Sequence, residues 1–161
     1  FLVEQLQNHS VEREYSAIVY GHMISGGSIN EPIGRDPKDR VKQAILTNGK
    51  EALTHYRVID RFKSHTQDKA ILETGRTHQI RVHLSHIDHP LLGDPMYGGR
   101  VRFPKKACQE LKDELINFQR QALHSKKLTL THPATGKSMT WKADIPDDMQ
   151  GLLNTLKNFD S

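Results

Sequence analysis

The residues that could do chemistry are densest between positions 72 and 99, where the chain reads LETGRTHQIRVHLSHIDHPLLGDPMYGG. Two arginines in this segment, Arg76 and Arg81, could hold a carboxylate or a phosphate through charged hydrogen bonds. On one helix, side chains five positions apart point about 140° away from each other. We therefore expect that the two do not serve one small site equally. One would face a pocket, and the other would contact the backbone of a polyanion or a structural carboxylate.

The same segment is rich in histidine. His83, His86 and His89 follow one another at intervals of three, and His78 lies five positions before His83. Zinc sites on helices use histidine pairs four positions apart with a nearby glutamate, and no H-E-x-x-H motif occurs in this sequence. The spacing therefore favours exposed or hydrogen-bonded structural histidines over a metal site.

Asp94 lies between Gly93 and Pro95 and could act as a nucleophile or a general base. An aspartate before proline in a glycine-bounded loop more often accepts hydrogen bonds from nearby backbone and stabilises a turn. We therefore interpret Asp94 as a turn residue.

The elements that would position these side chains follow from the hydrophobic spacing. Ile80, Leu84 and Ile87 predict a helix over about 78–87, with Thr77 as its N-terminal cap. Similar spacing predicts three more helices, over residues 1–8, 108–118 and 146–159. Strands are expected over residues 15–23, 28–33, 42–47, 51–62, 69–74, 121–131 and 138–144.

Two turn signals indicate how the strands connect. The run Asn48-Gly49-Lys50 predicts a hairpin that joins strands 42–47 and 51–62, and residues 65–68 predict a second turn. Strands in such an order, with helices inserted and appended, predict one α+β domain with a mixed, mainly antiparallel sheet. No internal linker or repeat is evident.

Three stretches of the chain resemble a known family. TGRTHQIRVH at residues 74–83, followed by HPLLGDPMYG at residues 89–98, resembles the third motif of the RluA-type RNA pseudouridine synthases. REYSAIVYGH at residues 13–22 resembles the second motif, and residues 120–136 with the strand that ends at Pro146 resemble the terminal hairpin. The resemblance covers essentially the whole chain and implies the fold of a pseudouridine synthase catalytic domain.

The resemblance also implies a reaction. Such enzymes convert uridine to pseudouridine in structured RNA, here large-subunit ribosomal RNA. They detach uracil from its ribose, rotate it and rejoin it through carbon, with a catalytic aspartate and no cofactor or metal. The tyrosine of the second motif falls on Tyr15, which would pack on the flipped base and help in proton removal. The basic residue that pairs with the catalytic aspartate falls on Arg81.

Four neighbouring positions are carried over by the same resemblance. Ile80 and Val82 flank Arg81 and are expected to form apolar walls of the substrate site. Arg76 and His78 match motif positions that would support the helix or contact RNA. From the pattern alone, Tyr15 could instead be a core aromatic and Arg81 an exposed helix residue.

One motif of the family does not occur in the sequence. The family's catalytic H-R-L-D run, followed by glycine, precedes the second motif, and here the chain begins at Phe1 within a predicted helix. We therefore expect residues 1–161 to be the C-terminal portion of the catalytic domain, N-terminally incomplete and inactive alone, without the catalytic-aspartate segment and the N-terminal RNA-binding domain. A sheet that lacks strands exposes its edges, so we expect self-association through those edges or a core with gaps.

Composition limits the partner and the compartment. Lysine and arginine total 23 against 19 aspartates and glutamates, a net charge of +4 that is compatible with a polyanionic partner. Basic residues gather in two Gly- and Pro-containing segments, 32–42 and 98–106. No run of apolar residues is long enough for a membrane span. The single cysteine, Cys108, fits a reducing compartment, so we expect a cytoplasmic protein. RNA as the partner, rather than DNA or a membrane, is what the resemblance implies.

Two alternatives remain at this point. A non-catalytic RNA-binding module could reuse the same fold, and an upstream H-R-L-D run followed by glycine would distinguish the enzyme from it. A histidine-rich metal protein is the weaker alternative, and elemental analysis of the purified chain would test it.

Overall fold

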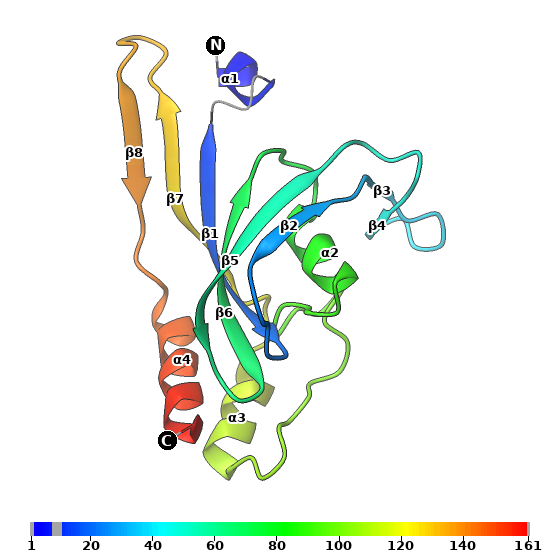
Figure 1. The fold of residues 1–161 in the computed structure, drawn as a ribbon, viewed down its shortest axis with the longest axis vertical. Helices are drawn as coiled ribbons and strands as arrows, with labels where there is room; N and C mark the ends of the chain where they lie inside the picture. Colours follow the sequence, from blue (N-terminus) through cyan, green and yellow to red (C-terminus); the bar gives the residue numbers. More distant parts are fainter. Residues whose placement is uncertain (1, 8–10, 161) are drawn as a thin grey trace.

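The computed structural model describes residues 2–7 and 11–160, with helices on a curved antiparallel sheet (Figure 1). The helices are α1 (Leu2–Gln7), α2 (Gln79–His86), α3 (Gln109–Asn117) and α4 (Asp147–Asp160). The strands are β1 (Glu12–Tyr20), β2 (Gly27–Asn30), β3 (Ile33–Arg35), β4 (Gln43–Ile45), β5 (Leu53–Arg61), β6 (His65–Leu72), β7 (Leu123–Thr131) and β8 (Ser138–Lys142).

Six strands form the main sheet, in the order β2-β5-β6-β1-β7-β8, and every neighbouring pair is antiparallel. The β3–β4 pair forms a second, two-stranded sheet. The central strand β1 pairs with β6 on one side and with β7 on the other, so Tyr15 lies opposite Ala70 and Ser125. The predicted α+β class with a mainly antiparallel sheet is confirmed.

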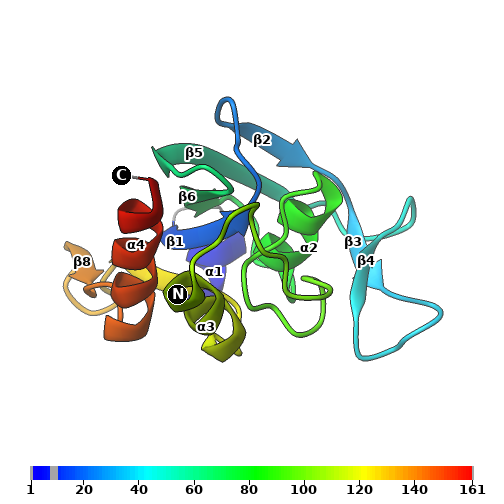
Figure 2. The ribbon, with the colours of Figure 1, turned by 90° about the horizontal axis from the view of Figure 1, so that it is seen from below.

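The two faces of β1 are buried in two different cores because successive side chains of a strand point to opposite faces. Ile18 and Tyr20 belong to a core that contains Leu111 and Leu115 of α3. The same core takes in the α4 residues Met149, Leu152, Leu153 and Leu156. Figure 2 shows α3 and α4 side by side, while α2 lies nearer the β3–β4 pair.

Ala17 and Val19 of β1 belong to the second core, together with Ile80 and Leu84 of α2. Burial of these apolar side chains attaches α2 to the central strand. Since Arg81 is the residue after Ile80, the packing of Ile80 also fixes where Arg81 leaves the helix.

Several predicted elements are confirmed. The helix expected over 78–87 is α2, the helical spacing from Cys108 to Phe118 is α3, and the last helix is α4. The two strands expected after residue 120 are β7 and β8. The first predicted helix is α1, although its expected ends, Phe1 and Asn8, lie outside the described residues. No helix in the described part of the chain is both long and apolar enough to cross a bilayer.

The predicted hairpin between residues 42–47 and 51–62 is wrong. β4 pairs with β3, whereas β5 pairs with β2 and β6. The turn at Gly49 does occur, but it leads the chain back onto β3. There Ile33 and Lys50 exchange two backbone hydrogen bonds, of 2.9 and 2.8 Å. Residues 28–33, expected to form one strand, are divided between β2 and β3.

The turn predicted at residues 65–68 is also wrong, because these residues begin β6. The chain reverses at residues 62–64, where the amide of Phe62 donates to the carbonyl of His65 at 2.9 Å. Three of the polar residues that suggested a turn are buried within the sheet, with His65 1%, Thr66 0% and Asp68 0% exposed.

Candidate active site

Helix α2 is positioned by Gln79 rather than by the predicted cap, Thr77. The residue before the helix is His78, whose φ of 56° lies in the left-handed region, and its side chain makes no capping hydrogen bond to a described residue. Gln79 stabilises the preceding turn instead. Its Oε1 accepts from the Thr74 hydroxyl at 2.7 Å and from the Arg76 amide at 3.0 Å.

A chain of buried hydrogen bonds continues from Gln79 along α2. The Gln79 Nε2 donates to the carbonyl of Leu53 and to the hydroxyl of Thr54, both at 3.0 Å. The Thr54 hydroxyl donates in turn to Nδ1 of His83 at 2.7 Å, and Nε2 of His83 donates to the carbonyl of Glu31 at 2.9 Å. The Thr54 hydroxyl needs an acceptor for its proton, and Nδ1 of His83 can accept only when the ring is neutral. The sequence reasoning did not identify this network.

Burial lowers the pKa of His83, against the opposing effect of its hydrogen bond to Glu31. This shift favours the neutral ring that the hydrogen-bond directions require. His89 is also hydrogen-bonded, through Nδ1 to the carbonyl of Tyr20 at 2.8 Å. The prediction of structural histidines is confirmed for these two residues. In the part of the chain that the structure describes, no three candidate ligands gather in a way that could hold a metal ion.

Arg81 forms a bidentate ion pair with Asp94. Its Nε donates to Oδ2 at 2.9 Å and its Nη2 donates to Oδ1 at 2.8 Å. Asp94 also accepts from the amides of Met96 at 2.9 Å and Tyr97 at 3.1 Å, so the predicted turn role is confirmed. Asp94 has the additional role, absent from the sequence interpretation, of orienting Arg81.

The ion pair is charged and largely shielded from water. The Asp94 side chain is 0% exposed and that of Arg81 is 11% exposed. Burial would raise the pKa of Asp94, but the hydrogen bonds from Arg81, Met96 and Tyr97 outweigh it and hold that pKa below its usual value. The hydrogen bond to Asp94 raises the pKa of Arg81. Nη1 of Arg81 has no hydrogen-bond partner among the described residues, so it remains available to a second acceptor.

A hollow of about 160 Å³ brings the predicted residues from separate motifs together. Tyr15 reaches it from β1, and Ile80 and Arg81 reach it from α2. Arg76 and His78 line the hollow from the segment before the helix. Its lining is completed by Leu72, Gln79 and Leu123.

Arg76 and Arg81 therefore line the same hollow, contrary to the expectation drawn from helical spacing. Because α2 begins at Gln79, Arg76 precedes the helix and the helical angle does not apply to it. The Nε of Arg76 donates to the carbonyl of Glu51 at 2.7 Å.

The structure does not bring Val82 to this hollow. Its side chain is buried in a third core with Ile33 and Ala52. Each step along a helix turns the side chain by about 100°, so residues two positions apart point to nearly opposite sides. Ile80 and Val82 therefore face different cores. Tyr15 combines the two interpretations considered for it, since it packs against the core of Ala17 and also lines the hollow.

Tyr97 connects the hollow to the β3–β4 pair, and sequence reasoning did not single it out. Its hydroxyl accepts from the amide of Gln43 at 2.9 Å and donates to Nδ1 of His78 at 2.8 Å. The guanidinium of Arg81 lies over its ring, with 5.0 Å from the guanidinium carbon to the ring centroid. Burial, followed by the nearby charge of Arg81, lowers the pKa of His78. The only signal for Tyr97 was its place in the DPMYG run.

Comparison with known proteins agrees with these motifs. The family model described as RNA pseudouridylate synthase matches residues 2–86. Ribosomal large subunit pseudouridine synthase D from Pseudomonas aeruginosa is 54% identical over 156 residues, which cover 97% of this chain and 49% of that protein. The protein of the same name from Escherichia coli K12 is 51% identical, with 97% and 48% covered. The chain thus spans about half the length of the curated relatives it matches.

Two solved structures share the fold. Human RNA pseudouridylate synthase domain containing 4 superposes with a TM-score of 0.73 at 26% identity, over 97% of this chain and 66% of that one. Human RNA pseudouridylate synthase domain containing 1 superposes with a TM-score of 0.70 at 22% identity, over 96% and 69%. With the family model matching more than half of its residues, the chain belongs to the RNA pseudouridylate synthase family.

Proposed function

We propose that the chain is the C-terminal portion of a pseudouridine synthase catalytic domain, whose whole protein converts uridine to pseudouridine in large-subunit ribosomal RNA. The observation that carries the proposal is the meeting of Tyr15 and Arg81 in one hollow, although they come from different motifs. The names of the relatives support ribosomal RNA as the substrate.

The proposed reaction breaks the bond between uracil N1 and the ribose carbon, rotates the base and forms a bond from uracil C5 to the same ribose carbon. The proton on C5 leaves to the solvent, N1 takes up a proton in place of its bond to ribose, and no cofactor is required. The target nucleotide must first be extruded from the RNA, at an unstacking cost of a few kcal/mol. The Tyr15 ring offers an apolar face for the extruded base and a polar tip for the proton transfer.

Arg81 holds the catalytic aspartate in this proposal. Asp94 occupies Nε and Nη2 of the guanidinium and fixes its plane, while Nη1 is left for the carboxylate of the catalytic aspartate. Such a contact keeps the carboxylate ionised and directed at the substrate. Arg76 and His78, at the rim of the same hollow, would contact the RNA.

Tritium release from RNA labelled at uracil C5 tests the proposal. A protein in which the chain follows its upstream segment with the H-R-L-D run should release tritium from large-subunit ribosomal RNA. The 161-residue chain alone should release none above the buffer control, because its sequence has no H-R-L-D run. Robust release by the chain alone would contradict the assignment of the catalytic aspartate. No release by the longer protein would favour the non-catalytic RNA-binding module.

We also propose that the partner is RNA rather than DNA and that the protein acts in the cytoplasm, where ribosomal RNA is found.

The chain alone is proposed to self-associate through the edges of its sheet. Trp141 on the edge strand β8 is 47% exposed, which supports pairing there. Sedimentation should show a concentration-dependent dimer that the change Trp141→Lys weakens. A compact monomer at all concentrations would contradict self-association.

A further inference from the structure

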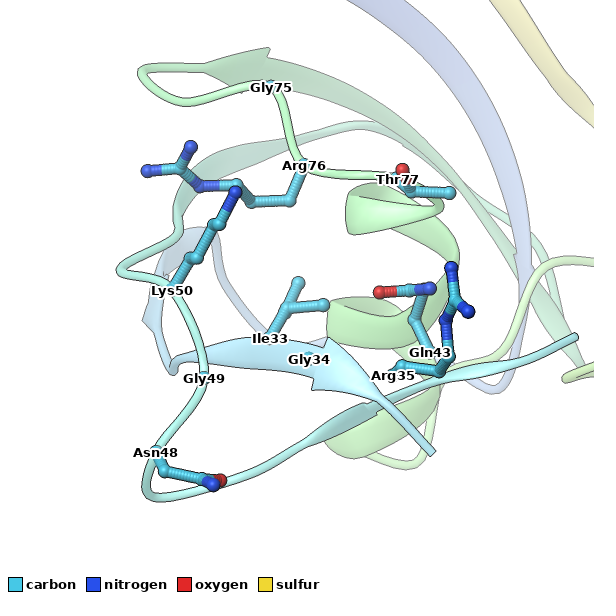
Figure 3. A pocket seen from close by; sticks show the side chains of 10 residues that line it. All are labelled: Ile33, Gly34, Arg35, Gln43, Asn48, Gly49, Lys50, Gly75, Arg76 and Thr77. Carbon is cyan, nitrogen blue, oxygen red and sulfur yellow. The ribbon is translucent and has the colours of Figure 1, made fainter. Parts of the chain in front are cut away.

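A second, larger cavity adjoins the candidate active site. It has a volume of about 510 Å³ and lies between the β3–β4 pair, the turn at Gly49 and the segment that precedes α2 (Figure 3). Its lining residues are Ile33, Gly34, Arg35, Gln43, Asn48, Gly49, Lys50, Gly75, Arg76 and Thr77.

The charged side chains of this cavity are all cationic. Arg35, Lys50 and Arg76 line it, and none of them forms an ion pair with any described residue. The acidic neighbours in sequence, Asp36 and Glu51, do not line it. Positive side chains without a counter-charge attract an anion and repel a metal ion, so the cavity suits an anion.

The cavity is held in shape by backbone contacts. Lys50 is attached to β3 through the two hydrogen bonds between its backbone and Ile33. Gly49 packs so closely against the same strand that a Cβ there would lie 2.7 Å from the carbonyl carbon of Ile33. The contact from Nε of Arg76 to the Glu51 carbonyl, at 2.7 Å, fixes that guanidinium and leaves its two terminal nitrogens without a partner among the described residues.

Figure 3 shows the cations on different walls of the cavity. The side chains of Lys50 and Arg76 lie next to each other, whereas Arg35 and Gln43 lie on the other side. The arrangement allows donors to approach one anion from more than one direction. A tetrahedral phosphate diester accepts hydrogen bonds in this way.

The cavity and the candidate active site are adjacent. Arg76 lines both, and the consecutive residues Thr77 and His78 line the cavity and the hollow respectively. A nucleic acid strand that places one base in the hollow therefore brings a neighbouring part of its backbone to the cavity.

We propose that this cavity binds a backbone phosphate of the RNA strand next to the nucleotide held in the hollow. The inference rests on the proposed function and adds a phosphate-binding site to it. Phosphate contacts of this kind fix the register of a strand without reading its sequence.

Binding of a short hairpin RNA by the 161-residue chain tests the inference without any need for turnover. Fluorescence anisotropy at several salt concentrations should show that Lys50→Ala and Arg35→Ala each weaken binding about 3- to 10-fold at 0.1 M salt. Each change should also reduce the slope of log K against log salt concentration by about 1. Both side chains are exposed, so the folded state should be retained, which circular dichroism checks.

Lys137→Ala is the matched control because it removes the same charge from the exposed turn between β7 and β8, away from the cavity. If the Lys50 and Arg35 variants bind RNA like this control, the phosphate site is wrong while the proposed function stands. If the unmodified chain binds no RNA, the inference fails, whereas the proposed function is tested separately by tritium release from the longer protein.

Discussion

Arg81 on α2 and Asp94 in the following loop are joined by two parallel hydrogen bonds, of 2.9 and 2.8 Å, with the carboxylate fully buried. The pair fixes the orientation of the guanidinium that lines the candidate active site. Because Asp94 also accepts from two loop amides, the same carboxylate stabilises the loop and orients the arginine.

We expect Asp94→Asn to destabilise the folded chain by about 3 kcal/mol, since it leaves a shielded guanidinium without its counter-charge. Urea unfolding measures the loss. Asp148→Asn is the control, because Asp148 forms an equally bidentate pair with Arg120 that is 50% and 43% exposed. That change should cost less than about 1 kcal/mol. Equal losses in the two variants would show that burial of the Arg81 pair has no effect on stability.

Gln79→Ala should cost about 2 kcal/mol, because the buried carbonyl of Leu53 and the hydroxyls of Thr54 and Thr74 lose a hydrogen-bond partner. Gln109→Ala is a matched control: Gln109 is likewise the first residue of its helix, but it is exposed, and among the described residues its side chain donates only to Asp113. This control should change the free energy of unfolding by less than about 0.5 kcal/mol. If both variants have the same urea midpoint of unfolding, the hydrogen bonds of Gln79 do not hold α2 in position.

Tyr97→Phe should disconnect the β3–β4 pair from His78, because the amide of Gln43 loses its acceptor. Amide hydrogen exchange at Gln43 should then become faster, while exchange within β1 stays the same. Tyr56→Phe serves as the control, since the Tyr56 hydroxyl has no hydrogen-bond partner in the described part of the chain. Unchanged protection of Gln43 would contradict the connection.

The stability of the chain should depend on pH through Asp68, a fully buried carboxyl on β6 that accepts no hydrogen bond from a described residue. Burial raises the pKa of Asp68 to about 7, although the charge of Arg61 opposes this. Between about pH 4 and pH 7 the folded state therefore holds a proton that the unfolded state has already released. The free energy of unfolding falls as the pH rises through this range.

Comparison with Asp68→Asn isolates the effect, because both proteins keep His65, whose pKa burial lowers to about 4. Between pH 5 and pH 8 the unmodified chain should lose on the order of 2 kcal/mol of unfolding free energy relative to the variant. Urea unfolding at the two pH values measures the difference. Parallel pH profiles of the two proteins would mean that Asp68 does not hold a proton in the fold.

The helices could be predicted from sequence because their signal is local. In α4, Met149, Leu152, Leu153 and Leu156 recur at helical spacing and are all buried on one side. Strand pairing is different, since a turn such as the one at Gly49 shows that the chain bends but not which strand it meets. β4 pairs with β3, with Ile33 opposite Ile45, and such contacts between residues distant in sequence carry no local signal.

Of the candidate site, only part could be proposed from the sequence. Tyr15 and Arg81 could be identified through the motifs that contain them, and the structure places both in one hollow. The partner of Arg81 could not, because Asp94 lies 13 positions away and looked like an ordinary turn residue. The buried network of Gln79 and His83 was missed for a related reason, since each polar side chain finds its partner on a different element.

The most direct test is tritium release from C5-labelled large-subunit ribosomal RNA by the proposed longer protein, in which an H-R-L-D run precedes this chain. The variants Tyr15→Phe and Arg81→Lys, and the remote control Arg120→Lys, are compared with the unmodified protein. We predict that Tyr15→Phe and Arg81→Lys each lower the rate by at least about 100-fold with little change in RNA affinity. Tyr15→Phe removes a general acid–base group, which contributes roughly that factor. Arg81→Lys removes the bidentate geometry that would hold the catalytic aspartate in place, and misplacement of a catalytic group costs about as much. The control should stay within about twofold, since it changes an exposed ion pair. Full activity in the Tyr15 and Arg81 variants would contradict the placement of the active site in this hollow.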